Sequence, residues 1–411
     1  MTETLTETAR RIFAAGVAAA DPVQAVRRAL EERPLAPVTG RRVVIAVGKA
    51  AIGMAEAAQV VLPDIDRVLI VTNYENTREV PGAEVFAAGH PVPDEGGEAA
   101  AKAVIAALSE LGSEDAVLAL ISGGGSALLP APAEGLTLAD KARVNSLLLA
   151  SGADITEMNL VRQQLSRLKG GGVLRVASPA QVTSLILSDV VGDDLRVIAS
   201  GPTVSPIGTR AEAVALCEAR GIWDDLPEAV RRNLEHEDDI QADLPTADNR
   251  LIGSNGISVA AMAREADGAL VAPEPLEGDV EDAARLVADV ATGGGCWLFG
   301  GETTVRIKGD GLGGRNQELA MRVALEAEAR GWSGDWAFLS GGTDGRDGPT
   351  DAAGGLVGPD TLARMRAEGV DPQAALARND SYHALNAAGA LLMTGATGTN
   401  VADLQVLIRT G

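Results

Sequence analysis

The chain has 411 residues, more than one hydrophobic core usually supports, so we expect two or three domains. Hydrophobic residues make up 46% of the sequence but aromatic residues only 2%, so alanine and branched aliphatic residues must build the cores. The formal net charge of −22 disfavours nucleic acid and anionic membranes as partners. The polar, acidic N-terminus is no signal peptide and no apolar run reaches transmembrane length, which leads us to expect a cytoplasmic protein.

Apolar runs alternate with helical patterns through the first half of the chain. The runs predict strands at 43–47, 68–71, 85–88, 117–121 and 182–187. The helical patterns cover 50–61, 98–111, 138–150, 155–169 and 210–220. Because these strands are apolar on both faces, the pattern predicts an α/β fold with a parallel sheet covered by helices on both sides.

Composition changes around residues 235–247, which are acidic and poor in pattern. This change predicts a boundary between a first domain, 1–237, and a second domain, 248–411. Strands are predicted in the second domain at 251–252, 296–299, 336–339 and 406–408, with an alternating, half-exposed one at 305–308. Helices are predicted at 257–265, 280–291, 316–330 and 384–392. We expect a C-terminal α/β domain whose final segment is able to pack back on the first domain.

Residues 299–318 are the segment most indicative of function. Arg306 and Lys308 alternate, a glycine-dense turn follows, and Arg315 opens a helix. Glycine N–H groups, a helix start and nearby cations together suit an anion, phosphate most of all. The net negative charge of the chain repels anions. A local cluster of cations therefore has to outweigh this repulsion where an anion binds.

Two further glycine turns follow predicted buried strands, the position at which α/β sheets bind ligands. The first contains Lys49, which can neutralise a phosphoryl or carboxylate oxygen; an ordinary surface turn explains it equally well. No Walker A pattern occurs in the chain. The second is a candidate anion nest, with a tight turn as the alternative. Its binding candidates are Ser122, Gly123, Gly124, Gly125 and Ser126.

A basic group ends the helix predicted at 155–169. Arg162 and Lys169 there are candidate ligands for substrate or nucleotide, although cations at a helix end also offset its dipole. Gly171 belongs to a glycine run that would allow the backbone to approach a ligand closely. Lys141 lies within a helical pattern, and we expect it to be solvated.

Carboxylates that suit Mg²⁺ follow two strands. Asp189 and Asp193 lie beyond the strand at 182–187, and Glu302 lies in the segment 299–318. Loop solvation and helix capping are the alternatives. Asp344 lies in a loop whose aspartates resemble a calcium loop with the wrong spacing, so a role in binding metal or nucleotide stays open. The G-x-G-x-x-G at 309–314 lacks a buried first strand and is a weak dinucleotide fingerprint.

These segments together resemble the class II glycerate kinases, the glycerate 2-kinase family, which carries an older label of hydroxypyruvate reductase. Three matching motifs are Ala-Val-Gly-Lys-Ala at 46–50, Gly-His-Pro-Val-Pro-Asp at 89–94 and Leu-Ile-Ser-Gly-Gly-Gly-Ser-Ala at 120–127. Others lie at 166–172, 187–194, 200–203, 300–318, 340–355 and 397–404. They span nearly the whole chain in the family's order, so the resemblance is specific.

The resemblance implies two domains, the first Rossmann-like with three layers and a mostly parallel sheet, and an active site in the cleft between them. It implies phosphorylation of D-glycerate at the 2-hydroxyl by Mg²⁺ and ATP, with Lys49 and Arg315 essential. We expect Asp189 to bind metal or orient the hydroxyl, and Asn316 and Asp344 to contact ligands. The oligomeric state is open, a homodimer being one arrangement.

Two other functions fit some of these features. An NAD(P)H-dependent hydroxypyruvate reductase is the alternative enzyme, suggested by the older family label and by the weak fingerprint at 309–314. A non-enzymatic anion-binding protein would also explain the glycine loops, but the chain has no recognisable interaction module.

Overall fold

The computed structural model describes residues 3–236 and 244–410, which form two compact units. The parallel-sheet unit comprises Pro22–Ser188 and Gly192–Ile252. The mixed-sheet unit comprises Met1–Asp21, Asp189–Val191 and Gly253–Gly411. The first 21 residues thus group with the C-terminal half, whereas the sequence analysis assigned them to the first domain. Residues 237–243, at the expected boundary, lie outside the described residues.

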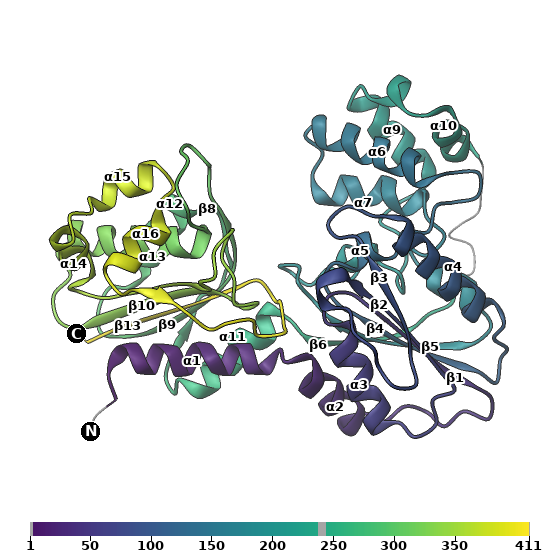
Figure 1. Cartoon of the computed structure of the whole chain (residues 1–411), viewed down its shortest axis with the longest axis horizontal. Helices are drawn as coiled ribbons and strands as arrows, with labels where there is room; N and C mark the ends of the chain where they lie inside the picture. The colour runs from purple at the N-terminus through teal and green to yellow at the C-terminus, as the bar shows by residue number, and fades with distance from the viewer. Residues whose placement is uncertain (1–2, 237–243, 411) are drawn as a thin grey trace. The chain divides into compact units, whose positions relative to one another are not determined.

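The parallel-sheet unit is built on a six-stranded sheet (Figure 1). Its strands are β1 (Arg42–Val47), β2 (Arg67–Asn73), β3 (Glu84–Ala88), β4 (Ala116–Ile121), β5 (Gln181–Leu187) and β6 (Asp248–Gly253). Their spatial order is β3-β2-β1-β4-β5-β6, and β1 to β5 pair in parallel. This is the strand order of the Rossmann fold, in which ligands bind where the order reverses, between β1 and β4.

Helices connect and cover these strands. They are α2 (Pro22–Glu32), α3 (Ala51–Val61), α4 (Glu95–Ser109), α5 (Gly125–Leu128), α6 (Leu138–Ala150), α7 (Ile155–Gln164), α8 (Gly172–Ala177), α9 (Arg210–Ala219) and α10 (Glu228–Glu235). Helices α6, α7, α9 and α10 pack around their own apolar core. Helix α7 ends at Gln164, before the predicted end at 169, because Ser166 accepts hydrogen bonds from the N–H groups of Leu168 and Lys169 and turns the chain.

The mixed-sheet unit contains strands that pair in both directions. They are β7 (Leu270–Val271), β8 (Leu276–Asp279), β9 (Gly295–Thr304), β10 (Trp336–Gly342), β11 (Gly354–Val357), β12 (Leu391–Leu392) and β13 (Asp403–Arg409). The order is β12-β11-β10-β13-β9-β7, and β8 also pairs with β9. The last strand, β13, is antiparallel to both β10 and β9. The final segment is thus a central strand of this sheet, and its expected packing on the first domain stays a prediction.

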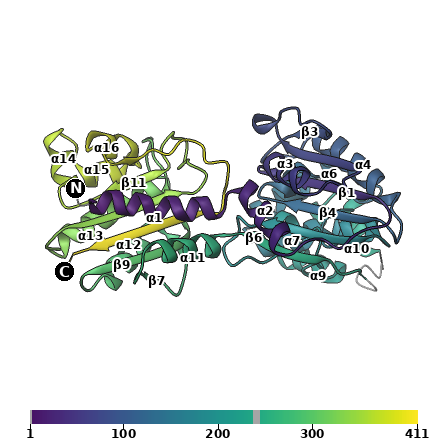
Figure 2. The ribbon, with the colours of Figure 1, turned by 90° about the horizontal axis from the view of Figure 1, so that it is seen from below.

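Helices cover both faces of the mixed sheet (Figures 1 and 2). They are α1 (Leu5–Ala19), α11 (Asn255–Glu265), α12 (Val280–Val290), α13 (Arg315–Ala329), α14 (Thr361–Ala367), α15 (Pro372–Ala377) and α16 (Ser381–Ala387). Helices α1 and α11 share one core with the sheet, and α12 to α16 share another. The expected strand at 305–308 is absent, since β9 ends at Thr304 and Ile307 is 82% exposed with no partner strand.

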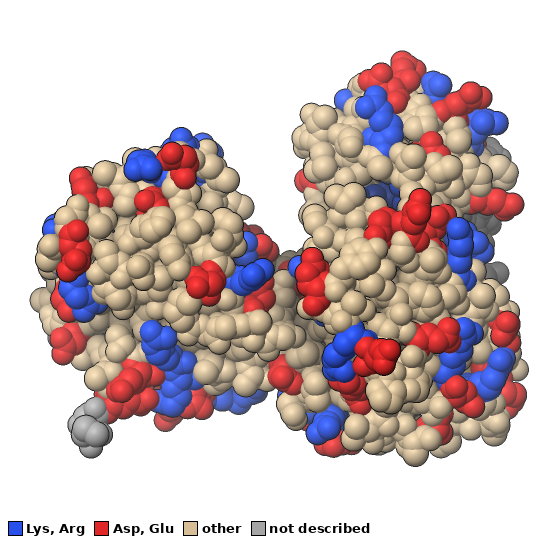
Figure 3. Space-filling view, viewed as in Figure 1, with Lys and Arg blue, Asp and Glu red and all other residues tan. Residues whose placement is uncertain are grey.

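Charged side chains of both signs are interspersed on the visible face of each unit (Figure 3). The cations that matter for an anionic ligand must therefore be sought in local arrangements. No helix within the described residues is both long and apolar enough to cross a membrane.

Candidate functional site

The turn after β1 is held against the end of β4. Gly48 has φ of 129°, and a Cβ placed on it would lie 2.1 Å from Oγ of Ser122, so only glycine fits there. The N–H of Lys49 donates to the carbonyl of Gly123 over 2.9 Å, and the N–H of Ala50 donates to Oγ of Ser122 over 3.2 Å. These bonds fix the backbone of Lys49 and leave its side chain exposed.

The glycine loop after β4 divides into a buried start and an end in which Gly124 and Ser126 are half-buried. Ser122 is only 1% exposed and its hydroxyl is used within the fold, so it braces the turn. Gly124 adopts the left-handed conformation with φ of 86°. No acceptor for the N–H groups of Gly124, Gly125 and Ser126 occurs within residues 3–236 and 244–410. These N–H groups are therefore not used by the described protein, and their binding of an anion stays a prediction.

Lys49 and His90 lie next to this loop. A Cβ on Gly124 would be 3.1 Å from Cδ2 of His90 and 3.4 Å from Cγ of Lys49. Burial and the charge of Lys49 lower the pKa of His90, although Glu75 opposes them. His90 is therefore neutral at pH 7, and Lys49 supplies the positive charge at this end of the loop.

A cavity of about 340 Å³ opens beside the loop. Its lining includes His90, Gly124, Ser126, Lys141, Arg162 and Lys169. Lys169 is 5% exposed, and its Nζ donates to the carbonyl and the hydroxyl of Ser126 over 2.8 and 2.5 Å. The predicted group of Lys49, the glycine loop, Arg162 and Lys169 is thus brought together within one unit.

Lys141 also lines this cavity, so the expectation that it is solvated was wrong. Helix α6 runs along the cavity wall and places Nζ of Lys141 3.2 Å from the carbonyl of Leu165. Burial, helped by Arg162, lowers the pKa of Lys141 to about 8. A helical pattern shows which face of α6 is apolar, but the packing partner that covers the lysine comes from another helix and is not visible in the sequence.

Gly171, a predicted binding residue, packs closely on a neighbouring loop. Its φ is 76°, and its N–H donates to the carbonyl of Gly201 over 2.8 Å. A Cβ there would lie 2.6 Å from Leu244. The close packing of two loops explains why glycine is needed at this position. The N–H group of Gly171 already donates to a protein carbonyl.

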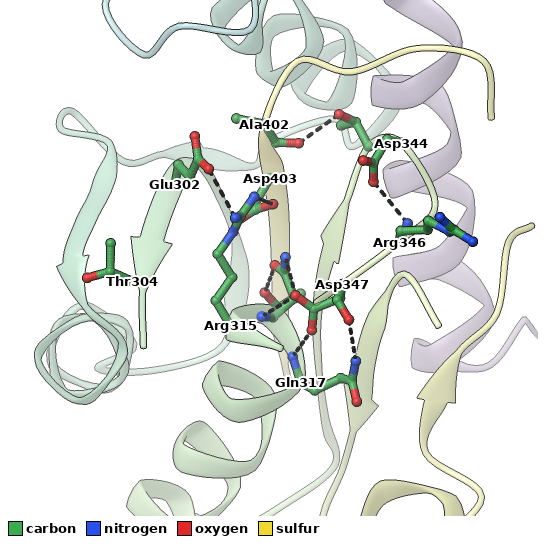
Figure 4. Close-up of polar contacts among 12 residues, drawn as sticks. Glu302, Thr304, Arg315, Gln317, Asp344, Arg346, Asp347, Ala402 and Asp403 are labelled. Carbon is green, nitrogen blue, oxygen red and sulfur yellow. Dashed lines mark hydrogen bonds and ion pairs between the residues drawn. The ribbon is translucent and has the colours of Figure 1, made fainter. Parts of the chain in front are cut away.

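Arg315, the first residue of α13, is held between two carboxylates in the mixed-sheet unit (Figure 4). Its Nε and Nη2 donate to Asp403 over 2.6 and 3.0 Å, and its Nη1 lies 3.0 Å from Glu302. Burial opposes the charge of Arg315, but the bonds to Asp403 and the charges of Asp403 and Glu302 outweigh it and raise its pKa. Its side chain keeps 34% of its surface exposed, so the guanidinium is oriented and still reachable.

Asp347 fixes the start of α13 beside Arg315 (Figure 4). Its carboxylate accepts hydrogen bonds from the N–H groups of Asn316 and Gln317 over 3.1 and 2.8 Å. Burial raises the pKa of Asp347 to about 6, although these two bonds oppose the shift. Asn316 is 1% exposed and its amide is bonded to Ser340 and Asp347, so it supports the helix start from inside the core.

The predicted metal ligands are divided between the two units. Asp189, Asp344 and Glu302 belong to the mixed-sheet unit, and Asp193 to the parallel-sheet unit. Burial raises the pKa of Glu302, Arg315 opposes this, and Asp403, Asp189 and Asp344 add to it. These carboxylates therefore lie within electrostatic reach of one another. No group of three potential ligands close enough to hold a metal by themselves occurs among the described residues.

The loop carrying the G-x-G-x-x-G at 309–314 packs on another loop of the same unit. Cβ atoms at Gly309 and Gly311 would each lie 2.5 Å from backbone atoms of Arg378. The loop follows the irregular residues 305–308 and no buried strand. Its glycines are explained by this close approach, which agrees with the doubt about a dinucleotide fingerprint.

Asp403 was not identified from the sequence, although it is the main partner of Arg315. It lies 88 residues further along the chain, at the start of β13, and its side chain is 1% exposed. An aspartate at a strand start is commonplace, and its contact with Arg315 is seen only in the folded structure. Asp403 lies in the motif at 397–404 that carries part of the family resemblance, but no role was assigned to it there.

Comparison with known proteins finds relatives that match nearly the full length of the chain. A family model described as a domain of unknown function, DUF4147, matches residues 8–235, and the MOFRL family model matches residues 295–403. A glycerate 2-kinase of Pyrococcus horikoshii is 40% identical, with 97% of this chain and 96% of the relative covered. A protein of Agrobacterium vitis, named provisionally as a hydroxypyruvate reductase, is 44% identical over 97% and 93%.

A solved structure has the same fold as this chain. The crystal structure of a glycerate kinase from Thermotoga maritima is 39% identical to this chain, covers 100% of both chains and superposes with a TM-score of 0.92. Sequence and structure agree over the full length, and the chain belongs to the glycerate kinase family.

Proposed function

We propose that this chain is a glycerate 2-kinase, which transfers the γ-phosphoryl group of ATP to the 2-hydroxyl of D-glycerate and releases 2-phosphoglycerate and ADP. The observation that carries the proposal is the full-length similarity to a glycerate 2-kinase and to the structure of a glycerate kinase. The local geometry supports it, because both units present oriented cations at the ends of their elements.

Phosphoryl transfer depends on positioning and on charge neutralisation more than on covalent chemistry. Lys49 has a fixed backbone and an exposed ammonium group, and Arg315 has a guanidinium oriented by Asp403. In the proposal, these two cations hold the transferred phosphoryl group and the carboxylate of glycerate. The N–H groups at Gly124, Gly125 and Ser126 would bind oxygens of a phosphate or carboxylate group beside Lys49.

The acidic group near Arg315 fits a metal that arrives with the nucleotide. Magnesium commonly takes only one or two protein carboxylates and completes its shell with phosphate oxygens and water. Asp189 and Glu302 are the first candidates to hold it, with Asp344 nearby. Bound Mg²⁺ would neutralise charge on the phosphates. Asp189 is alternatively the residue that accepts a hydrogen bond from the 2-hydroxyl and orients it.

The assay for this proposal follows two products. The protein is incubated with D-glycerate and Mg-ATP, ADP is followed, and enolase is added to detect 2-phosphoglycerate specifically. ADP formation that requires D-glycerate, together with an enolase signal, supports the proposal. ADP formation without an enolase signal would assign the phosphoryl group to a different hydroxyl.

A parallel reaction with hydroxypyruvate tests the reductase alternative. The name of the Agrobacterium vitis relative is the observation that supports this alternative. Oxidation of NADH or NADPH that requires hydroxypyruvate would support it. The packed glycine loop at 309–314 predicts that no such oxidation is seen.

A further inference from the structure

The cavity in the parallel-sheet unit gathers positive charge without compensation. Lys141, Arg162 and Lys169 line it, and none of the described residues that line it is acidic. The groups that perturb Lys141 and Lys169 are other cations: Arg162 acts on both, and Lys141 acts on Lys169. Burying like charges together without counter-ions costs stability, so a fold keeps such a cluster only when something else favours it.

Hydrogen bonds within the protein satisfy only part of these cations. Nζ of Lys141 donates to the carbonyl of Leu165, Nη2 of Arg162 donates to Oδ1 of Asn145, and Nζ of Lys169 donates to Ser126. All of these acceptors are neutral. The cluster therefore has hydrogen bonds but lacks a negative charge, and the cavity that it lines is large enough to admit one.

We propose that this cavity is the pocket that recognises a phosphate group of the ligands, with Lys141, Arg162 and Lys169 as its cationic ligands and the N–H groups of Gly124 and Ser126 as further donors. The proposal rests on the proposed function, which supplies two phosphate-bearing ligands, the nucleotide and 2-phosphoglycerate. A phosphate ester carries a charge of about −1.5 to −2 and three acceptor oxygens. A lone carboxylate brings one charge and two oxygens, which matches three convergent cations less well.

Binding of such an anion should take up protons. Burial, Lys141 and Arg162 hold the pKa of Lys169 well below its usual range, and Lys141 titrates near pH 8. The other charged or titratable groups facing them are Arg162 from α7 and the neutral His90. A bound phosphate would restore both lysines to their charged forms. Calorimetry at pH 8.5 in buffers of different ionisation enthalpy should therefore report net proton uptake, of which Lys141 alone supplies about three-quarters of a proton.

The experiment is calorimetric titration of the full chain with ADP, 2-phosphoglycerate, inorganic phosphate and D-glycerate. The variants are Lys141→Met and Arg162→Gln. Arg143→Met, an exposed position on the same helix α6, is the matched control. We expect Lys141→Met and Arg162→Gln to weaken binding of a phosphate-bearing probe by about 10- to 100-fold. D-glycerate binding and the control should be unchanged.

A stability measurement separates a ligand-binding role from a structural one. Removing one of three clustered cations relieves repulsion, so Lys141→Met without ligand should melt at the same temperature as wild type or higher. Loss of affinity for ADP alone assigns the pocket to the nucleotide, and loss for 2-phosphoglycerate alone assigns it to the product. Either result supports the pocket.

Two results would overturn the proposal. Both variants could bind every phosphate-bearing probe as wild type does, or they could weaken only D-glycerate. Because binding is measured without turnover, the outcome is independent of the kinase assay. If the protein has no glycerate kinase activity but its phosphate binding still depends on Lys141, the proposed function is refuted. The proposed phosphate pocket is then still supported.

Discussion

Replacement of Asp403 by asparagine should weaken the hydrogen bonds that orient the guanidinium of Arg315. The Asp403 side chain is 1% exposed and accepts two hydrogen bonds from the guanidinium, over 2.6 and 3.0 Å. Asparagine has nearly the same shape, but it carries no charge and offers a donor where one of the two acceptors stood. At least one of the two bonds is lost, and the guanidinium faces a buried N–H group.

The structure sets the size of the effect. Breaking a buried ion pair by removing one partner costs about 3–5 kcal/mol. Arg315 keeps Glu302 and about a third of its side chain in solvent, so we expect roughly 2–3 kcal/mol of lost unfolding free energy in Asp403→Asn. A shift of about 1 Å in a positioned group can lower the rate about 100-fold, so kcat should fall by about that factor.

The assay is the glycerate-dependent formation of ADP, with unfolding by urea measured in parallel. Asp310→Asn is the matched control, because Asp310 pairs with Arg378 at 3.0 Å while both side chains are mostly exposed. That pair is worth about 1 kcal/mol or less, and activity should be unaffected. A folded Asp403→Asn protein with wild-type kcat, or a control that loses as much, would refute the reasoning.

Three further predictions concern single residues. Arg315→Lys keeps the charge but cannot bond Asp403 through two parallel N–H groups, so kcat/KM for glycerate should fall by about 100-fold or more, and full activity would remove the assigned role. Lys49→Met should abolish most turnover while leaving the melting temperature unchanged, since the side chain is exposed; unchanged turnover would exclude Lys49 from the mechanism. Burial raises the pKa of Asp347 from 3.8 to about 6, so the native state retains a proton that the unfolded state releases between these values. Stability from this residue is therefore greatest below about pH 4 and falls by roughly 3 kcal/mol as the pH rises to 6, and Asp347→Asn should remove that slope from urea unfolding curves.

The features that the sequence predicted well are local. Apolar runs that end in glycine mark β1 and β4, and parallel pairing places the ends of neighbouring strands side by side. Lys49 and Gly124 therefore approach each other for reasons that are visible in two short segments. Arg315 was also placed correctly at a helix start, because Gly314 and the pattern of α13 mark it.

The features that were missed depend on distant packing. Residues 305–308 alternate like a strand, but no neighbouring strand is there to pair with them. Lys141 is covered through contact between two helices, and Asp403 bonds Arg315, which lies 88 residues earlier in the chain. Neither contact leaves a pattern in the residues around it, so periodicity and spacing could not reveal them.

The surroundings of Arg315 and the cavity lined by Lys141, Arg162 and Lys169 differ in the negative charge that accompanies their cations. The charge of Arg315 is offset by Asp403 and Glu302, with Asp189 and Asp344 adding further negative charge, so its contribution is the fixed geometry of the guanidinium. The cavity lined by Lys141, Arg162 and Lys169 has no acidic residue in its described lining. In a chain of net charge −22, the proposed pocket would offer an anionic ligand cations that have no carboxylate beside them in the described lining. The acidic surroundings of Arg315 favour an anion that is already paired with a divalent cation, as a nucleotide bound to magnesium is.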